Sequence, residues 1–375
     1  MIYIVTIFAL LALFIIEYNK KSIKTKRRVF WISTAIFFFL LAFRGNNVGG
    51  DTYEYCKFYL GKISSTYGML YNPFSQIEIG FIWFCKLFNP IFTSSFAFIF
   101  LSSLFSTFPF FLLVKKYSAY PSLSYFYVMC SNFMVMVVNL QTNLRQDIAI
   151  GYILLSIYLL LDNQINKKRL VLIVCLLTLS FLTHKSIYLI LPFGLLIWFI
   201  PFNRKISLLL IVASVVASVF YTSGIETIVM NLFSMSFFDS NEMLTQIANY
   251  VDNDKYGLTG KAGQLIVLLP STFWAVYNVY FASEEEMKNI FMKSIVIACV
   301  FINLGSSFPL SFRMVFAFQI LSVIYIPKRI CINTKLMVFN LLALSWIMYR
   351  LFVMVSTPSF YNNENHLLPY KFIWE

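Results

Sequence analysis

Basic side chains interrupt apolar stretches of this 375-residue sequence, where a charged group is energetically unfavourable. A charged side chain at the centre of a bilayer costs at least about 2.5–3.5 kcal/mol, so it normally faces a polar cavity or a partner. The planar guanidinium group binds phosphate oxygens through two parallel hydrogen bonds. The pattern therefore predicts a pocket for an anion that bears phosphate. Snorkelling of single side chains to lipid headgroups is the alternative. The residues are Arg44, Arg145, His184 with Lys185, Arg313 and Arg350.

Acidic groups and a histidine accompany these cations. Asp51 and Asp147 lie close in sequence to Arg44 and Arg145, so local ion pairs are the alternative to a chemical role. The stretch "GNNVGG" before Asp51 allows a close approach of backbone to a ligand. His184 is one of two histidines and could accept a proton or bind phosphate. Capping of a helix end is its structural alternative.

The composition predicts the fold class. Hydrophobic residues make up 59% of the chain and charged residues 12%, with a mean hydropathy of +0.76, whereas soluble domains carry about 25% charged residues. Apolar runs long enough to cross a bilayer recur along the chain. They lack the two-residue alternation of an outer-membrane barrel. We therefore expect an all-α, polytopic integral membrane protein that forms one domain over residues 1–375.

The apolar runs predict about twelve transmembrane helices. Their approximate ranges are 2–17, 29–43, 91–113, 120–138, 146–161, 170–183, 186–200, 206–221, 264–281, 289–305, 311–326 and 336–356.

The positions of the basic residues predict the orientation. The net charge of +13 comes largely from clusters in alternate short loops, which favours a membrane protein and not a nucleic-acid-binding one. By the positive-inside rule these loops are cytoplasmic, so both termini and the "RGNNVGGD" stretch lie outside. The clusters are Lys20, Lys21, Lys24, Lys26, Arg27 and Arg28; Lys115 and Lys116; Lys167, Lys168 and Arg169; Arg204 and Lys205; Lys328, Arg329 and Lys335.

Two outer segments need separate treatment. A further span at 74–90 would place the later basic clusters outside, so this segment is expected to be an interfacial or re-entrant helix with Glu78 at its start. A larger outer loop is expected at about 222–263, where acidic and basic residues alternate with apolar patches. One or two helices that lie on the membrane and contact a polar substrate would suit this loop, and a solvated loop is the alternative.

Four motifs occur in an order that resembles a known family. They are "FRGNNVGGDTYEY" (Phe43 to Tyr55), "IEIGFIW" (Ile77 to Trp83), "LRQDIAIGYILLS" (Leu144 to Ser156) and "FLTHKSIYLILP" (Phe181 to Pro192). In this order they resemble the EpsG-like branch of Wzy-type polysaccharide polymerases, which extend O-antigen, capsule or exopolysaccharide chains. The closing "LLPYKFIWE" is similar to the tail of that family, and Lys185 after the histidine is a departure from its pattern.

The resemblance implies a reaction and its partners. Such an enzyme binds undecaprenyl-pyrophosphate-linked oligosaccharides at the outer face of the bacterial cytoplasmic membrane and transfers the growing glycan onto a new repeat unit. It is a glycosyltransferase whose leaving group is a lipid pyrophosphate. The expected partners are these lipid-linked glycans and membrane lipid, without nucleic acid. A chain-length regulator is a further candidate partner that the sequence leaves open. No cofactor or metal is expected, because the sequence has no cluster at metal-ligand spacing.

The resemblance and the charges together give each residue a role. Arg145 and Arg313 are assigned to the pyrophosphate, with Arg44 and Arg350 as further members of that set. His184 is the candidate to orient or deprotonate the acceptor hydroxyl, and Asp51 is the alternative base. Lys185 and Glu78 are assigned to binding of the pyrophosphate or the glycan.

Two other functions use similar substrates. An O-antigen ligase-like glycosyltransferase usually has a very long outer loop with its own arginine and histidine, and the predicted outer loop at 222–263 contains neither residue. A lipid-linked oligosaccharide flippase should show internal repeats and charges along a central channel, which this sequence lacks. The polymerase is therefore favoured over both.

Overall fold

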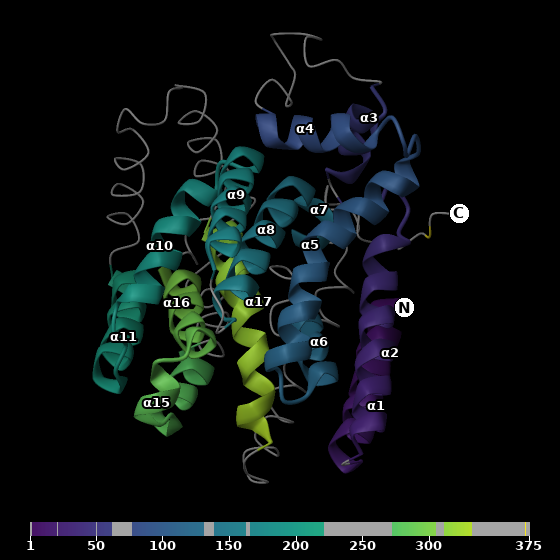
Figure 1. Ribbon diagram of the computed structural model, residues 1–375. Coiled ribbons are helices and arrows are strands. Elements are labelled where there is room, and N and C mark those ends of the chain that lie inside the picture. Colours follow the sequence, from purple (N-terminus) through teal and green to yellow (C-terminus); the bar gives the residue numbers. More distant parts are fainter. Residues whose placement is uncertain are drawn as a thin grey trace, which may run out of the picture. The chain divides into compact units, whose positions relative to one another are not determined.

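The computed structural model is built from α-helices (Figure 1). It describes residues 2–20, 22–49, 51–61, 77–130, 139–162, 166–220, 272–304, 311–331 and 372. Within these ranges no β-strand occurs, and one isolated antiparallel bridge joins Arg44 to Phe372. The expectation of an all-α protein is confirmed for the described chain.

The described helices are α1 (Ile2–Asn19), α2 (Ile23–Ala42), α3 (Thr52–Tyr59), α4 (Ile79–Phe88), α5 (Ser95–Tyr117), α6 (Pro121–Cys130), α7 (Asn139–Thr142), α8 (Leu144–Leu160), α9 (Lys167–Thr183), α10 (Ile187–Phe199), α11 (Arg204–Phe220), α15 (Glu284–Met287), α16 (Ile290–Leu304) and α17 (Ser311–Ile330). Residues 272–281 are also helical.

Helices occur where the apolar runs predicted spans. Each predicted span from 2–17 to 311–326 overlaps a described helix. Among the described residues, α1 and α5 are long and apolar enough to cross a membrane by length and composition. The number of about twelve spans therefore stays a prediction. The last predicted span, 336–356, and the outer loop at 222–263 lie outside the described residues.

Local sequence signals set the ends of α5. The Ser94 side chain accepts a hydrogen bond from the N–H of Ala97 at 3.1 Å, which satisfies one free donor at the helix start. Lys115 and Lys116 lie in the last turn, where positive charge is favourable against the helix dipole. The apolar run between these signals then forms the longest described helix of the bundle.

The chain divides into two compact units, and the first consists of residues 1–189 and 323–375. In this unit α8 packs against both α5 and α9. At Gly151 a Cβ atom would lie 2.2 Å from the carbonyl oxygen of Phe105, so α8 approaches the α5 backbone more closely than a side chain permits. The Ser180 hydroxyl donates to the carbonyl of Ala149 at 2.7 Å and ties α9 to α8.

Two short helices lie across one end of the long helices of this unit (Figure 1). Helices α3 and α4 pack on α5, α8 and each other through a buried apolar cluster. The helix expected within 74–90 is therefore present as the ten-residue α4, and its re-entrant or interfacial nature stays a prediction. The cluster contains Tyr55, Cys56, Tyr59, Phe81, Phe84, Cys85, Phe98, Ile99, Leu101, Leu144 and Ile148.

The second compact unit consists of residues 190–322. Lys293 of α16 is buried and donates from Nζ to the carbonyls of Ile197 and Ile200, each at 2.9 Å, so it caps the end of α10. Asn303 donates to the Ser214 hydroxyl at 2.9 Å and joins α16 to α11. These contacts account for charged and polar residues inside an apolar unit. The single domain over 1–375 stays a prediction.

Candidate functional site

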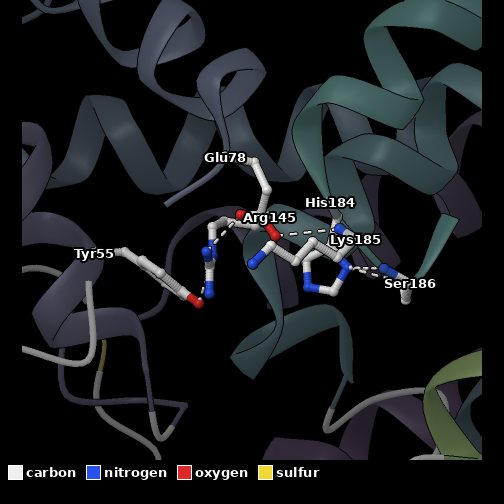
Figure 2. Close-up of polar contacts among 6 residues, drawn as sticks. All are labelled: Tyr55, Glu78, Arg145, His184, Lys185 and Ser186. Carbon is white, nitrogen blue, oxygen red and sulfur yellow. Dashed lines mark hydrogen bonds and ion pairs between the residues drawn. The ribbon is translucent and has the colours of Figure 1, made fainter. Parts of the chain in front are cut away.

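Arg145, at the start of α8, is held by two other segments of the first unit (Figure 2). Its Nε donates to the Tyr55 hydroxyl of α3 at 2.9 Å. Its Nη1 donates to Oε2 of Glu78 at 2.6 Å, in an ion pair whose side chains are 18% and 11% exposed. Two anchors on different nitrogens fix both the position and the plane of the guanidinium group.

Glu78 connects Arg145 to the turn between α9 and α10. While Oε2 pairs with the guanidinium, Oε1 accepts the backbone N–H of Lys185 at 3.1 Å. Figure 2 shows the carboxylate between Arg145 and the His184–Lys185 segment. Both oxygens of one carboxylate therefore join two segments that are far apart in the sequence.

The His184 ring is oriented by Ser186. The backbone N–H of Ser186 donates to Nδ1 at 3.1 Å, and the Ser186 hydroxyl lies 2.8 Å from the same nitrogen. His184 is also the C-cap residue of α9, where its N–H donates to the carbonyl of Ser180 at 3.3 Å. The expected helix-end position of His184 is therefore confirmed, and its ring is held by the following residues.

A glycine lets α4 approach the end of α9. A Cβ atom at Gly80 would lie 2.7 Å from the carbonyl carbon and oxygen of Leu182 and 2.9 Å from the nitrogen of Thr183. Because Glu78 is two residues before Gly80, this contact sets the distance from its carboxylate to the Lys185 amide. The motif "IEIG" thus supplies both the carboxylate and the space that it needs.

Asp51 lies at the N-cap of α3, one turn before Tyr55, and is exposed. Its backbone carbonyl accepts the N–H of Tyr55 at 3.0 Å. Its carboxylate acts electrostatically on Arg145. The structure therefore brings Asp51, Glu78, Arg145, Lys185 and His184 to one end of the first unit.

Arg44 takes part in a different set of contacts. It is fully buried and donates to the backbone carbonyls of Leu41, Val48 (3.3 Å) and Gln141 (3.2 Å), and to the Ser103 hydroxyl (3.3 Å). These bonds clamp the loop after α2 onto α5 and α7. Its assignment to the pyrophosphate stays a prediction, because the described contacts serve the protein itself.

The loop after α2 also packs closely against α7. Gly49 has a φ of 100°, which favours glycine. A Cβ atom there would lie 2.1 Å from the carbonyl oxygen of Gln141, which also accepts the Thr52 hydroxyl at 2.7 Å. Gly49 of the stretch "GNNVGG" therefore serves a close approach of backbone to backbone. A close approach to a ligand stays a prediction.

Asp147 does not pair with Arg145. Its side chain is buried, and neither carboxylate oxygen has a hydrogen-bond partner among the described residues. The guanidinium of Arg145 pairs with Glu78 instead. The local ion pair that the sequence suggested for these two neighbours is therefore absent. The Arg145 side chain extends from α8 toward Tyr55 of α3 and Glu78 at the start of α4.

Two further assigned residues have side chains outside the described part of the chain. Arg313 belongs to α17, but its side chain is outside the described part, and Arg350 lies wholly outside it. Sequence reasoning also missed Tyr55 and Ser186. Both stand inside the quoted motifs, and Tyr55 follows Asp51 by four residues and so shares its helical face.

The arrangement presents one guanidinium edge for a ligand. Nη2 of Arg145 makes no hydrogen bond to any described residue, while Nε and Nη1 are engaged. An oriented N–H pair of this kind suits a phosphate oxygen. In the part of the chain that the structure covers, no three His, Cys, Asp or Glu side chains are placed to share a metal ion.

Comparison with known proteins identifies the family. The model of the EpsG family matches residues 27–372, which include every motif of this site. No curated protein and no solved structure matches the chain.

Proposed function

Because the chain belongs to the EpsG family, a family of Wzy-like polysaccharide polymerases, we propose that it polymerises lipid-linked oligosaccharide repeat units. The donor is a glycan on undecaprenyl pyrophosphate, and the acceptor is the next lipid-linked unit. The acceptor hydroxyl attacks the anomeric carbon of the donor glycan, and the lipid pyrophosphate leaves with the bonding electron pair. Family membership supports the polymerase role. The donor and acceptor are those that the family resemblance implies, and the anchored Arg145 guanidinium suits a diphosphate leaving group.

The observation that carries this proposal is the two-point anchoring of Arg145 by Tyr55 and Glu78. Negative charge grows on the diphosphate as the glycosidic bond breaks. A cation that is already oriented stabilises that charge without reorganising. In many enzymes such electrostatic stabilisation of the transition state is the largest single contribution to the rate enhancement. Nη2 is the group that would bind the diphosphate, because the other two nitrogens hold the guanidinium in place.

The remaining assigned residues take roles around this centre. Lys185 adds a second positive charge on the turn that Glu78 holds. Glu78 supports binding through Arg145 and Lys185. Arg313 and Arg350 remain predicted cations for the pyrophosphate, and Arg44 holds the loop after α2.

The reaction is placed at the outer face of the bacterial cytoplasmic membrane. The basic clusters of the sequence favour cytoplasmic loops opposite to the ends that carry the site. In this orientation both termini lie outside, and α3 and α4 lie on the outer surface of the bundle. Lipid-linked repeat units that have crossed the membrane would then meet Arg145 directly.

A gel of surface polysaccharide from a deletion strain tests the proposal. Loss of a polymerase leaves single repeat units on the final acceptor and removes the ladder of longer chains. Free lipid-linked polymer would instead indicate an O-antigen ligase-like glycosyltransferase. Precursor retained inside the cell would indicate a lipid-linked oligosaccharide flippase. Complementation with the wild-type chain restores the ladder in the expected case.

A further inference from the structure

The hydrogen bonds around His184 determine which ring nitrogen carries the proton. A backbone N–H can only donate, so the Ser186 amide at 3.1 Å requires a lone pair on Nδ1. A neutral imidazole has one N–H and one lone pair, and the bond made by one nitrogen fixes the state of the other. The neutral ring therefore carries its proton on Nε2.

The turn that carries the ring is held at successive residues. The N–H of Lys185 donates to Glu78, and the N–H of Ile187 donates to the carbonyl of His184 at 3.1 Å. Together with the contact of Gly80 against the end of α9, these bonds hold the Ser186 amide within hydrogen-bond distance of Nδ1. Moving the proton to Nδ1 would bring two N–H groups together and break the bond from Ser186.

We propose that His184 donates its Nε2–H to the departing diphosphate beside Arg145 and does not act as the base. This inference rests on the proposed function, and it decides between the two bases that the sequence left open. In the transfer step the acceptor oxygen bonds to the anomeric carbon and the bond from that carbon to the diphosphate oxygen breaks. The electron pair goes to the diphosphate, and the acceptor proton goes to the Asp51 carboxylate. The Nε2–H acts as a hydrogen-bond donor, so Nε2 keeps its proton throughout.

The geometry supports a donor at this place. Lys185 follows His184 directly, and Glu78 connects the Lys185 amide to the guanidinium of Arg145. One carboxylate thus sets the spacing between the turn that bears the histidine and the arginine assigned to the diphosphate. Two oriented donors, Arg145 and His184, would stabilise the negative charge that develops on the departing diphosphate.

Nitrogen NMR measures the proton position without reference to activity. The chain has two histidines, so a His366→Gln variant labelled with ¹⁵N-histidine in lipid nanodiscs reports on His184 alone. The one-bond N–H coupling and the ¹⁵N shifts should place the proton on Nε2 and leave Nδ1 unprotonated. A proton on Nδ1 at neutral pH, alone or in addition to Nε2, would overturn the inference.

Conservative variants test the donor in the reaction. The amide nitrogen of glutamine can replace an Nε2–H, whereas that of asparagine lies nearer to the Nδ1 position. With an undecaprenyl-pyrophosphate-linked repeat unit as substrate, His184→Gln should keep kcat within about tenfold of wild type, and His184→Asn should lose about 100-fold, the usual effect of removing one such donor. An equal loss in both variants would contradict the donor role, since a base cannot be replaced by an amide. Failure of the wild-type chain to polymerise would contradict the proposed function. It would not affect the NMR assignment of the proton position on His184.

Discussion

Glu78 and Arg145 are 67 residues apart in sequence, yet their side chains meet at 2.6 Å. Their exposures of 11% and 18% are lower than those in the pairs Lys57–Glu54, Lys116–Asp162 and Arg169–Asp162, where every side chain is more than 30% exposed. Surface pairs contribute little to stability, whereas breaking a buried pair leaves a charge without compensation. This pair is therefore the contact on which the geometry of the site depends most.

Replacing Glu78 by alanine should destabilise the protein and reduce polymerisation together. The Arg145 guanidinium would lose its shortest hydrogen bond, a loss of about 2 kcal/mol for a charged partner. The matched control is Glu54→Ala, which breaks the more exposed pair with Lys57 on α3. Thermal unfolding in nanodiscs and the length of the glycan ladder measure both effects. Equal effects of the two substitutions would show that the Glu78–Arg145 pair contributes no more to stability and activity than the Glu54–Lys57 pair.

Replacing Arg145 by lysine should abolish long chains although the charge is kept. A lysine ammonium is a point charge and cannot reach Tyr55, Glu78 and a diphosphate at once. We expect kcat to fall by about 10² or more, as for the loss of an oriented donor. Tyr55→Phe removes one anchor and should have a smaller effect, with Tyr53→Phe on the same helix as its control, since Tyr53 is exposed. Full activity of the lysine variant would show that only the positive charge of Arg145 is required, and not the geometry of its guanidinium group.

A methyl group at Gly80 should separate α4 from the end of α9. The new Cβ would lie 2.7 Å from the backbone of Leu182, so a helix must shift, at about 1–3 kcal/mol for an overpacked contact. Because Glu78 moves with α4, Gly80→Ala should lower both the melting temperature and the activity. Gly194→Ala is the control, because a Cβ at that helical position meets no atom within 4 Å. The idea fails if the two alanines behave alike.

Cysteine labelling tests both the loop and its side of the membrane. Asn47 is exposed, whereas Cys56 is buried and burial raises the pKa of its thiol to about 11. A raised pKa keeps this thiol protonated at neutral pH, and the thiolate is the reactive form. In an Asn47→Cys variant that keeps only Cys56 of the native cysteines, a membrane-impermeant maleimide should label position 47 from outside intact cells and spare Cys56.

The control is the same background without the new cysteine, which should remain unlabelled. Reaction at position 47 only after permeabilisation would reverse the predicted orientation. Rapid labelling of Cys56 would contradict its place in the apolar cluster beneath α3.

The sequence singled out residues that the fold brings close together, but it did not indicate their contacts. Arg145, Glu78 and His184 stand in motifs whose order suggested a site, and hydropathy placed the helices. The pairing of Glu78 with Arg145 depends on how α4 packs against α9 and α8, which no local signal gives. Arg44 shows the same limit, because it binds backbone carbonyls that have no signature in the sequence. Aspartates nearby in sequence were obvious partners for the arginines, and for Arg145 the fold provides a glutamate instead.

Polymerisation by the purified chain tests the central claim most directly. Wild-type protein and the Arg145→Ala variant would be placed in liposomes with an undecaprenyl-pyrophosphate-linked repeat unit, and both glycan length and released lipid pyrophosphate would be measured. We predict a ladder of chains with one lipid pyrophosphate released for each linkage in the wild type, and unchanged single units with the variant. A ladder of normal length from Arg145→Ala would contradict the claim that this guanidinium group stabilises the leaving diphosphate.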